Sequence, residues 1–260
     1  MHARNWILVA VSAAVTLTAC RGGFRLTTYP TNESLFTAGV QEYEQEQWNN
    51  AIAAFEKLTA ELPARDTLLP RSYWYLARAH GQQREHLLAA QAYSRLFESF
   101  PDDTLADDAA FEAAHSYQRL WRKPTLDPTY GEIALATYNT MLGLYGESSE
   151  YAEEARREIA ALEQGFATKA YDTGLFYFRR KYYDSGIIYF REVLDRWPHV
   201  PRARDALMRL AESFREIQYR EDWAEACARL RATYPSDPEV GEVCENAPAA
   251  DSAAAPPRVP

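Results

Sequence analysis

The most reactive side chains of the sequence do not form a catalytic pattern. No histidine pair shows a metal-ligand spacing, and no glycine-rich phosphate loop, Gly-x-Ser-x-Gly or Cys-x-x-Cys motif occurs. Carboxylates cluster in one helical region, where such clusters usually form a solvated face. We therefore expect no enzymatic activity, no metal and no cofactor. The residues considered are His2, His80, His86, His115, His199, Glu150, Glu153, Glu154 and Glu158.

Two of the three cysteines, Cys227 and Cys244, lie 17 residues apart near the C-terminus. Between them Pro235 ends one predicted helix and Asp237-Pro238 begins another, so the chain turns back on itself. The turn permits a disulfide if the two Cα atoms come within about 4.4–6.8 Å. Two alternatives stay open: both thiols are unpaired, or Cys244 pairs with another chain.

The third cysteine, Cys20, follows a nearly continuous apolar run over residues 6–17. A helix of this length is about 18 Å long and cannot span a hydrocarbon core of about 30 Å. We therefore predict that residues 1–19 are a signal peptide. The run ends in Leu17-Thr18-Ala19-Cys20, which resembles the bacterial lipobox. Because Arg21 follows instead of aspartate, the resemblance implies a lipidated Cys20 and an anchor in the outer membrane, facing the periplasm.

The overall composition excludes one class of partner and allows a large core. The formal net charge is −9 and the pI is about 5.2. Nucleic-acid binding needs a basic field, so we expect no nucleic-acid partner. The 47% of hydrophobic residues is enough for a packed domain.

Helical stretches that end in proline recur along the chain. Pro63, Pro101, Pro198 and Pro235 are separated by 38, 97 and 37 residues. The short separations are close to a tetratricopeptide repeat, and the long one fits two units with an insertion. With a 3.6-residue apolar period, this predicts an all-α, right-handed α-solenoid of five helical hairpins and a short C-terminal capping helix. The predicted hairpins cover residues 34–66, 69–103, 105–148, 166–200 and 203–246.

Segments outside these hairpins have predicted roles of their own. Residues 20–33 form the lipidated N-terminus and a linker, and the Ala/Pro composition of residues 247–260 predicts a disordered tail. Residues 121–129 lengthen the turn of the third hairpin. There Asp127 or Thr125 can cap the second helix, with Pro128 in its first turn.

The first helices of the first two hairpins predict a peptide-binding groove. In this type of repeat, defined positions of the first helix line the concave surface, and here they combine aromatic residues with arginines. Such a wall suits an apolar peptide that ends in a carboxylate, which arginine binds bidentately. Alternatively, Trp74 and Tyr75 are core residues covered by the neighbouring hairpin. The candidate residues are Phe36, Val40, Tyr43, Arg71, Trp74, Tyr75 and Arg78.

Three stretches together carry a resemblance to a known family. They are residues 34–58, the Leu126-Asp127-Pro128-Thr129 insertion, and residues 177–198. With the lipobox they resemble the BamD (ComL) family, the lipoprotein subunits of the outer-membrane β-barrel assembly machinery. The resemblance implies a non-enzymatic scaffold on the periplasmic face of the outer membrane. A scaffold coordinating cell-envelope or peptidoglycan assembly is the alternative.

The resemblance also implies the partners. They are the POTRA domains of the barrel-forming subunit, other assembly lipoproteins, and unfolded outer-membrane proteins bound through their C-terminal signals. The POTRA domains are expected to contact the insertion, through Trp121 and Asp127, and the fourth hairpin. In the family an arginine on that hairpin takes part; its position corresponds to Tyr189 here, with Arg191 nearby.

Overall fold

A computed structural model describes residues 23–249, which form α-helices, one short 3-10 helix at Leu26–Thr28 and no strand. The predicted signal peptide, Cys20 and residues 250–260 lie outside the described residues. The helices are α1 (Asn32–Glu44), α2 (Trp48–Glu61), α3 (Leu68–Gln82), α4 (His86–Ser99), α5 (Ala106–Gln118), α6 (Thr129–Tyr145), α7 (Ala152–Arg179), α8 (Tyr183–Arg196), α9 (Arg202–Glu216), α10 (Arg220–Thr233) and α11 (Pro238–Val243).

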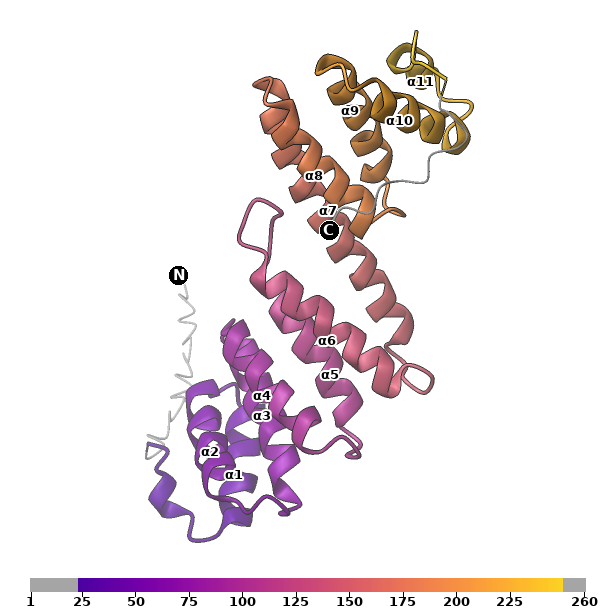
Figure 1. Ribbon diagram of the computed structural model, residues 1–260. Coiled ribbons are helices and arrows are strands. Elements are labelled where there is room, and N and C mark those ends of the chain that lie inside the picture. Colours follow the sequence, from indigo (N-terminus) through magenta and orange to yellow (C-terminus); the bar gives the residue numbers. More distant parts are fainter. Residues whose placement is uncertain (1–22, 250–260) are drawn as a thin grey trace, which may run out of the picture.

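The helices pack as an elongated array of hairpins (Figure 1). Each helix contacts mainly the helices next to it in sequence, so α1–α2, α3–α4, α5–α6, α7–α8 and α9–α10 stack in order. The short α11 packs against α9 and α10 and covers the open end. The predicted all-α solenoid with a C-terminal capping helix is confirmed.

Four of the five hairpins turn with the same backbone geometry. Glu46, Arg84, Lys181 and Gln218 each have a φ of 59–63°, in the left-handed region. In each turn the following residue donates its backbone N–H to a carbonyl five residues back, as Gln47 does to Glu42 and Tyr182 to Tyr177. These bonds satisfy carbonyls that the end of a helix leaves unpaired. The third hairpin lacks this turn and has the insertion instead.

A glycine and an aromatic ring fix the distance between the helices of a hairpin. A Cβ on Gly39 would lie 3.0 Å from both Ala54 and Phe55. In the fourth hairpin, a Cβ on Gly174 would lie 2.7 Å from Phe190. Both rings are fully buried. The same contact therefore holds two hairpins that are far apart in sequence.

The long helix α7 corrects one predicted boundary. The sequence predicts that the fourth hairpin begins at residue 166, but α7, its first helix, starts at Ala152. Its first half packs on the third hairpin, where Gln118 of α5 donates to Glu158 at 2.6 Å. Its second half pairs with α8. The helix thus belongs to two hairpins and joins the N-terminal three to the C-terminal two, as Figure 1 shows.

Residues 119–128 connect α5 to α6 and contain all of the predicted insertion except Thr129. This connection is held against α7. Trp121 is only 7% exposed and stacks on Phe166 of α7 with 4.4 Å between ring centroids. Further along, Lys169 of α7 donates to the Leu126 carbonyl at 2.9 Å. Trp121, which is expected to contact the POTRA domains, therefore has its ring in the core between the third hairpin and α7, and the contact itself stays a prediction.

Candidate functional site

The predicted groove residues form one aromatic cluster between the first two hairpins. Tyr75 of α3 stacks on Phe55 of α2 at 5.3 Å, and its edge contacts are Phe36 at 5.9 Å and Tyr43 at 5.5 Å. Trp74 packs on Tyr93 of α4 at 5.4 Å. Tyr43, Trp74 and Tyr75 are half-buried. They fill the space between hairpins and still present ring surface to the outside.

Two exposed arginines lie over this cluster. The Arg71 guanidinium is 5.2 Å from the Phe36 ring, and that of Arg78 is 5.2 Å from Tyr43 and 5.8 Å from Trp74. Among the described residues, neither arginine forms an ion pair with a carboxylate. A guanidinium held over a ring keeps its N–H groups free for an incoming carboxylate.

One groove residue is corrected. Phe36 is 7% exposed and contacts Phe55 at 5.8 Å, so it is part of the core beneath Arg71. Val40 is half-buried and packs against the same core. The two interpretations of this region, groove wall and core, therefore apply to different residues. The arginines and the half-buried rings can form a wall, whereas Phe36 supports it from below.

The candidate interface residues of the fourth hairpin are already engaged within the chain. Arg191 of α8 pairs with Asp222 of α10 at 3.2 Å and lies 5.4 Å from the Phe214 ring of α9. Tyr189 is half-buried and stacks on Tyr177 of α7 at 5.7 Å. Arg191 thus connects the last two hairpins, yet its side chain is still 54% exposed.

The side chain of Asp127 forms a hydrogen bond at the end of the insertion. Its carboxylate accepts the backbone N–H of Thr129 at 3.0 Å, at the start of α6. Hydrogen bonds from the Thr129 hydroxyl and backbone lower the pKa of Asp127, because they stabilise the charged form. Asp127 is exposed. The carboxylate therefore caps a helix at the surface where the partner is expected.

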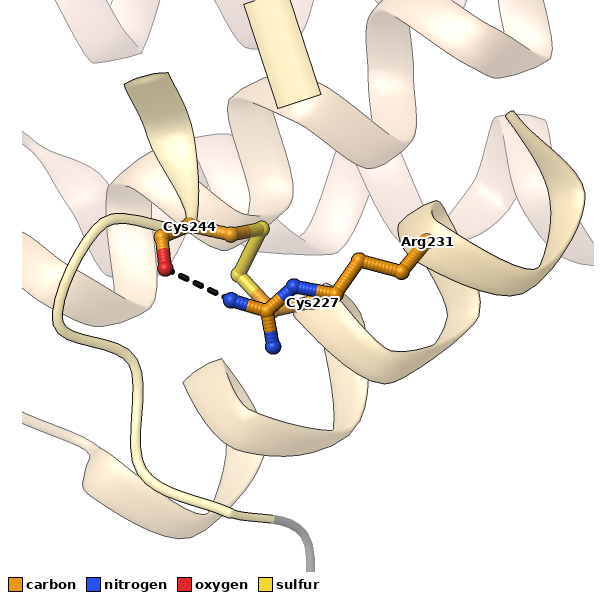
Figure 2. The surroundings of a disulfide bond; sticks show 3 residues. All are labelled: Cys227, Arg231 and Cys244. Carbon is orange, nitrogen blue, oxygen red and sulfur yellow. Dashed lines mark hydrogen bonds between the residues drawn. A yellow bond between two sulfur atoms is a disulfide. The ribbon is translucent and has the colours of Figure 1, made fainter. Parts of the chain in front are cut away.

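The two C-terminal cysteines are bonded in the structure. Cys227 of α10 and Cys244 after α11 form a disulfide with a Cα–Cα distance of 5.5 Å (Figure 2). Both residues are buried. Arg231 of α10 donates to the Cys244 carbonyl at 2.8 Å and fixes the same corner of the cap. The bond connects α11 to the last hairpin.

A second connection to the cap has no signal in the sequence. Arg204 of α9 donates to Asp237 and to Glu239, each at 2.7 Å. These hydrogen bonds raise the pKa of Arg204, first through Glu239 and then through Asp237. More than thirty residues separate the arginine from its partners. No local spacing could have predicted the contact.

Residues 23–249 contain neither a candidate metal centre nor a candidate membrane span. No group of three or more histidine, cysteine, aspartate or glutamate side chains is placed to hold a metal ion. No helix in this part of the chain is both long and apolar enough to span a membrane.

Comparison with solved structures gives distant similarities. The tetratricopeptide-repeat protein TTC0263 of Thermus thermophilus is 18% identical, with a TM-score of 0.35, over 81% of this chain and 95% of that one. A tetratricopeptide-repeat protein of Parabacteroides merdae is 17% identical, with a TM-score of 0.36, over 82% and 70%. The type IV pilus biogenesis factor PilW is 14% identical, with a TM-score of 0.28, over 82% and 97%. No curated protein sequence matches the chain.

The stacked helical hairpins define a class, the α-helical repeat proteins. Within it the family is shown by sequence. Residues 29–230 match the family model YfiO, described as an outer membrane lipoprotein. The chain belongs to this family of outer membrane lipoproteins.

Proposed function

We propose that the protein is a non-enzymatic, lipid-anchored scaffold of the β-barrel assembly machinery. It binds the POTRA domains of the barrel-forming subunit through its C-terminal half and the C-terminal signals of unfolded outer-membrane proteins through the first two hairpins. The observation that carries the proposal is the family match, which covers all five hairpins except the end of the last. Solenoids of this kind act by binding.

The test of the proposal is co-purification from the native envelope in mild detergent, followed by mass spectrometry. We expect the barrel-forming subunit and other assembly lipoproteins among the partners. Recovery of peptidoglycan-associated proteins in place of the barrel-forming subunit would contradict it. Extraction of a matched, unrelated outer-membrane lipoprotein serves as the control for nonspecific recovery.

The anchor gives a prediction of its own. Replacing Cys20 with serine removes the sulfur that carries the lipid, and we expect the variant to leave the membrane fraction. Two or more acyl chains are needed for stable anchoring, so the loss should be nearly complete. Membrane fractionation measures it, in cells that lack the partner subunit. Retention of the variant in the outer membrane would show that the anchor lies elsewhere.

The groove gives a prediction about the terminal carboxylate. In the double variant Arg71→Glu/Arg78→Glu, we expect a peptide with an aromatic last residue and a free carboxylate to bind at least about tenfold more weakly, because charge-assisted hydrogen bonds are lost. The amidated peptide should be affected much less. Isothermal titration calorimetry of both peptides measures this.

A control variant separates local binding from long-range charge. Arg156→Glu/Arg157→Glu makes the same change of net charge on exposed residues of α7. It should leave both affinities unchanged. Equal losses for the free and the amidated peptide in Arg71→Glu/Arg78→Glu would show that the two arginines do not bind the carboxylate.

The POTRA surface gives a prediction built on the Arg191–Asp222 pair. We expect Arg191→Glu to weaken binding of purified POTRA domains, but this variant also sets two carboxylates side by side. The exchange Arg191→Glu/Asp222→Arg restores the internal pair and leaves a carboxylate at position 191. We expect it to recover the melting temperature, with affinity still reduced. If affinity is recovered as well, Arg191 acts only inside the chain.

A further inference from the structure

A pocket of about 330 Å³ lies where the insertion meets α7. The end of α5 contributes Gln118, and the insertion contributes Trp121 and Pro124. From α7 come Leu162 and Gln164. None of these residues is needed for the groove of the first two hairpins, which lies on other helices.

Two buried polar atoms on residues that line this pocket have no hydrogen-bond partner among residues 23–249. They are the indole Nε1 of Trp121 and the side-chain carbonyl Oε1 of Gln164. The Trp121 side chain is more than nine-tenths buried. Buried polar groups in proteins are nearly always hydrogen-bonded, so two unpaired ones on residues of a single pocket favour a polar ligand there.

The contacts of Trp121 with two glycines show which part of its indole ring is covered. A Cβ on Gly131 would lie 2.5 Å from Cε3 of the ring, and one on Gly165 would lie 2.9 Å from Cη2. The two glycines therefore hold the six-membered edge of the indole. The N–H belongs to the five-membered ring, of which only the shared Cδ2 is among the atoms nearest to the glycines.

The other uncharged polar side chains of the pocket are satisfied. Gln118 accepts the Tyr138 hydroxyl at 2.9 Å and donates to Glu158. Thr168 donates to the Gln164 backbone carbonyl at 2.7 Å and accepts the Gln164 amide at 3.2 Å. What remains is one donor, on Trp121, and one acceptor, on Gln164. This pair matches a carboxamide, which accepts at its oxygen and donates at its nitrogen.

The edge of the pocket carries positive charge. Arg122 and Lys123 line it and are exposed, and neither pairs with a carboxylate among residues 23–249. In a chain with a net charge of −9, two adjacent unpaired cations favour an acidic ligand group beside the carboxamide.

We propose that this pocket binds an asparagine or glutamine side chain of a partner polypeptide, next to an aspartate or glutamate. The carboxamide oxygen accepts from Trp121 Nε1, and its nitrogen donates to Gln164 Oε1. The neighbouring carboxylate pairs with Arg122 and Lys123, whose exposed side chains move outward to admit the residue. The assignment concerns the chemistry of the ligand and holds for any partner that presents it, so it goes beyond the proposed function.

The test uses capped dipeptides and the NMR signal of the Trp121 indole N–H, which is assigned by its loss in Trp121→Phe. We expect acetyl-Gln-Glu-amide to shift this signal in a saturable manner. Acetyl-Leu-Glu-amide has a similar side-chain size without the carboxamide and should bind at least about tenfold more weakly. No shift of the Trp121 signal, or equal binding of both dipeptides, would overturn the proposal.

Variants separate the pocket from the rest of the chain. Gln164→Leu removes the acceptor and should weaken acetyl-Gln-Glu-amide at least about tenfold, while the indole signal stays in a folded spectrum. Gln91→Leu, at an exposed position of α4, is the matched control and should change nothing. Unchanged binding in Gln164→Leu would overturn the assignment, whether or not the protein binds POTRA domains.

Discussion

Trp121→Ala is expected to lower the free energy of unfolding by about 3–5 kcal/mol, the range for removing a large buried aromatic ring. The ring stacks on Phe166 and occupies the space that Gly131 and Gly165 leave open. Because these glycines have no side chains to fill the gap, the site cannot collapse and a cavity remains. Urea denaturation followed by circular dichroism measures the loss.

The comparison for this prediction is Trp48→Ala. Trp48 is half-buried at the start of α2, where its ring meets the edge of Tyr43 at 5.0 Å. Its removal should therefore destabilise the protein clearly less than removal of Trp121. Similar losses for the two variants would mean that Trp121 does not hold the third hairpin to α7. In that case the insertion would be a surface feature.

The position of Trp121 shows where sequence reasoning reached its limit. Its stacking partner Phe166 lies on α7, as does Gly165, whereas Gly131 lies on α6. The insertion has no periodic pattern, so nothing in it distinguishes a core tryptophan from an exposed one. The hydrogen-bonding state of Gln164 is equally invisible, because it depends on Thr168 and on the shape of the pocket.

The early start of α7 has a different cause. Its first two turns are rich in glutamate and arginine, a composition typical of a solvated face. The residues it buries there are the small Ala152 and Ala155, whereas the first large one is Leu162. Alanine favours a helix but adds little to an apolar pattern. The contact with the third hairpin was therefore not visible in the sequence.

The hairpins themselves were predictable because their signals are local. Phe55 follows Gly39 at the same spacing as Phe190 follows Gly174, and both pairs form the same contact. The start of the cap was also predictable, since the Asp237 side chain accepts the Glu239 N–H and Pro238 occupies the first turn. The groove stays a prediction. The pattern selected helices whose side chains cluster in the structure, but it could not separate the buried Phe36 from the exposed arginines.

Removal of the Cys227–Cys244 disulfide is expected to lower the free energy needed to open the cap by about 3 kcal/mol. This is the chain-entropy value for a loop of this length. The cap is the last helix of the array and packs mainly on α9 and α10, so it depends on few contacts. In Cys227→Ser/Cys244→Ser, we expect faster hydrogen exchange in α11. Exchange in α2, at the other end of the array, should not change.

When the disulfide is absent, the hydrogen bonds from Arg204 still connect α9 to the cap. Its bonds to Asp237 and Glu239 are partly exposed and are therefore weaker than the covalent link. Arg204→Gln alone should leave α11 protected, and the triple variant Arg204→Gln/Cys227→Ser/Cys244→Ser should lose protection of α11 almost entirely. If the cysteine variant exchanges as slowly as the wild type, the Arg204 bonds and the apolar packing of Val240 and Val243 are together enough to hold the cap. Non-reducing peptide mapping of envelope material is the companion measurement, and free alkylatable thiols at both positions would contradict the bond itself.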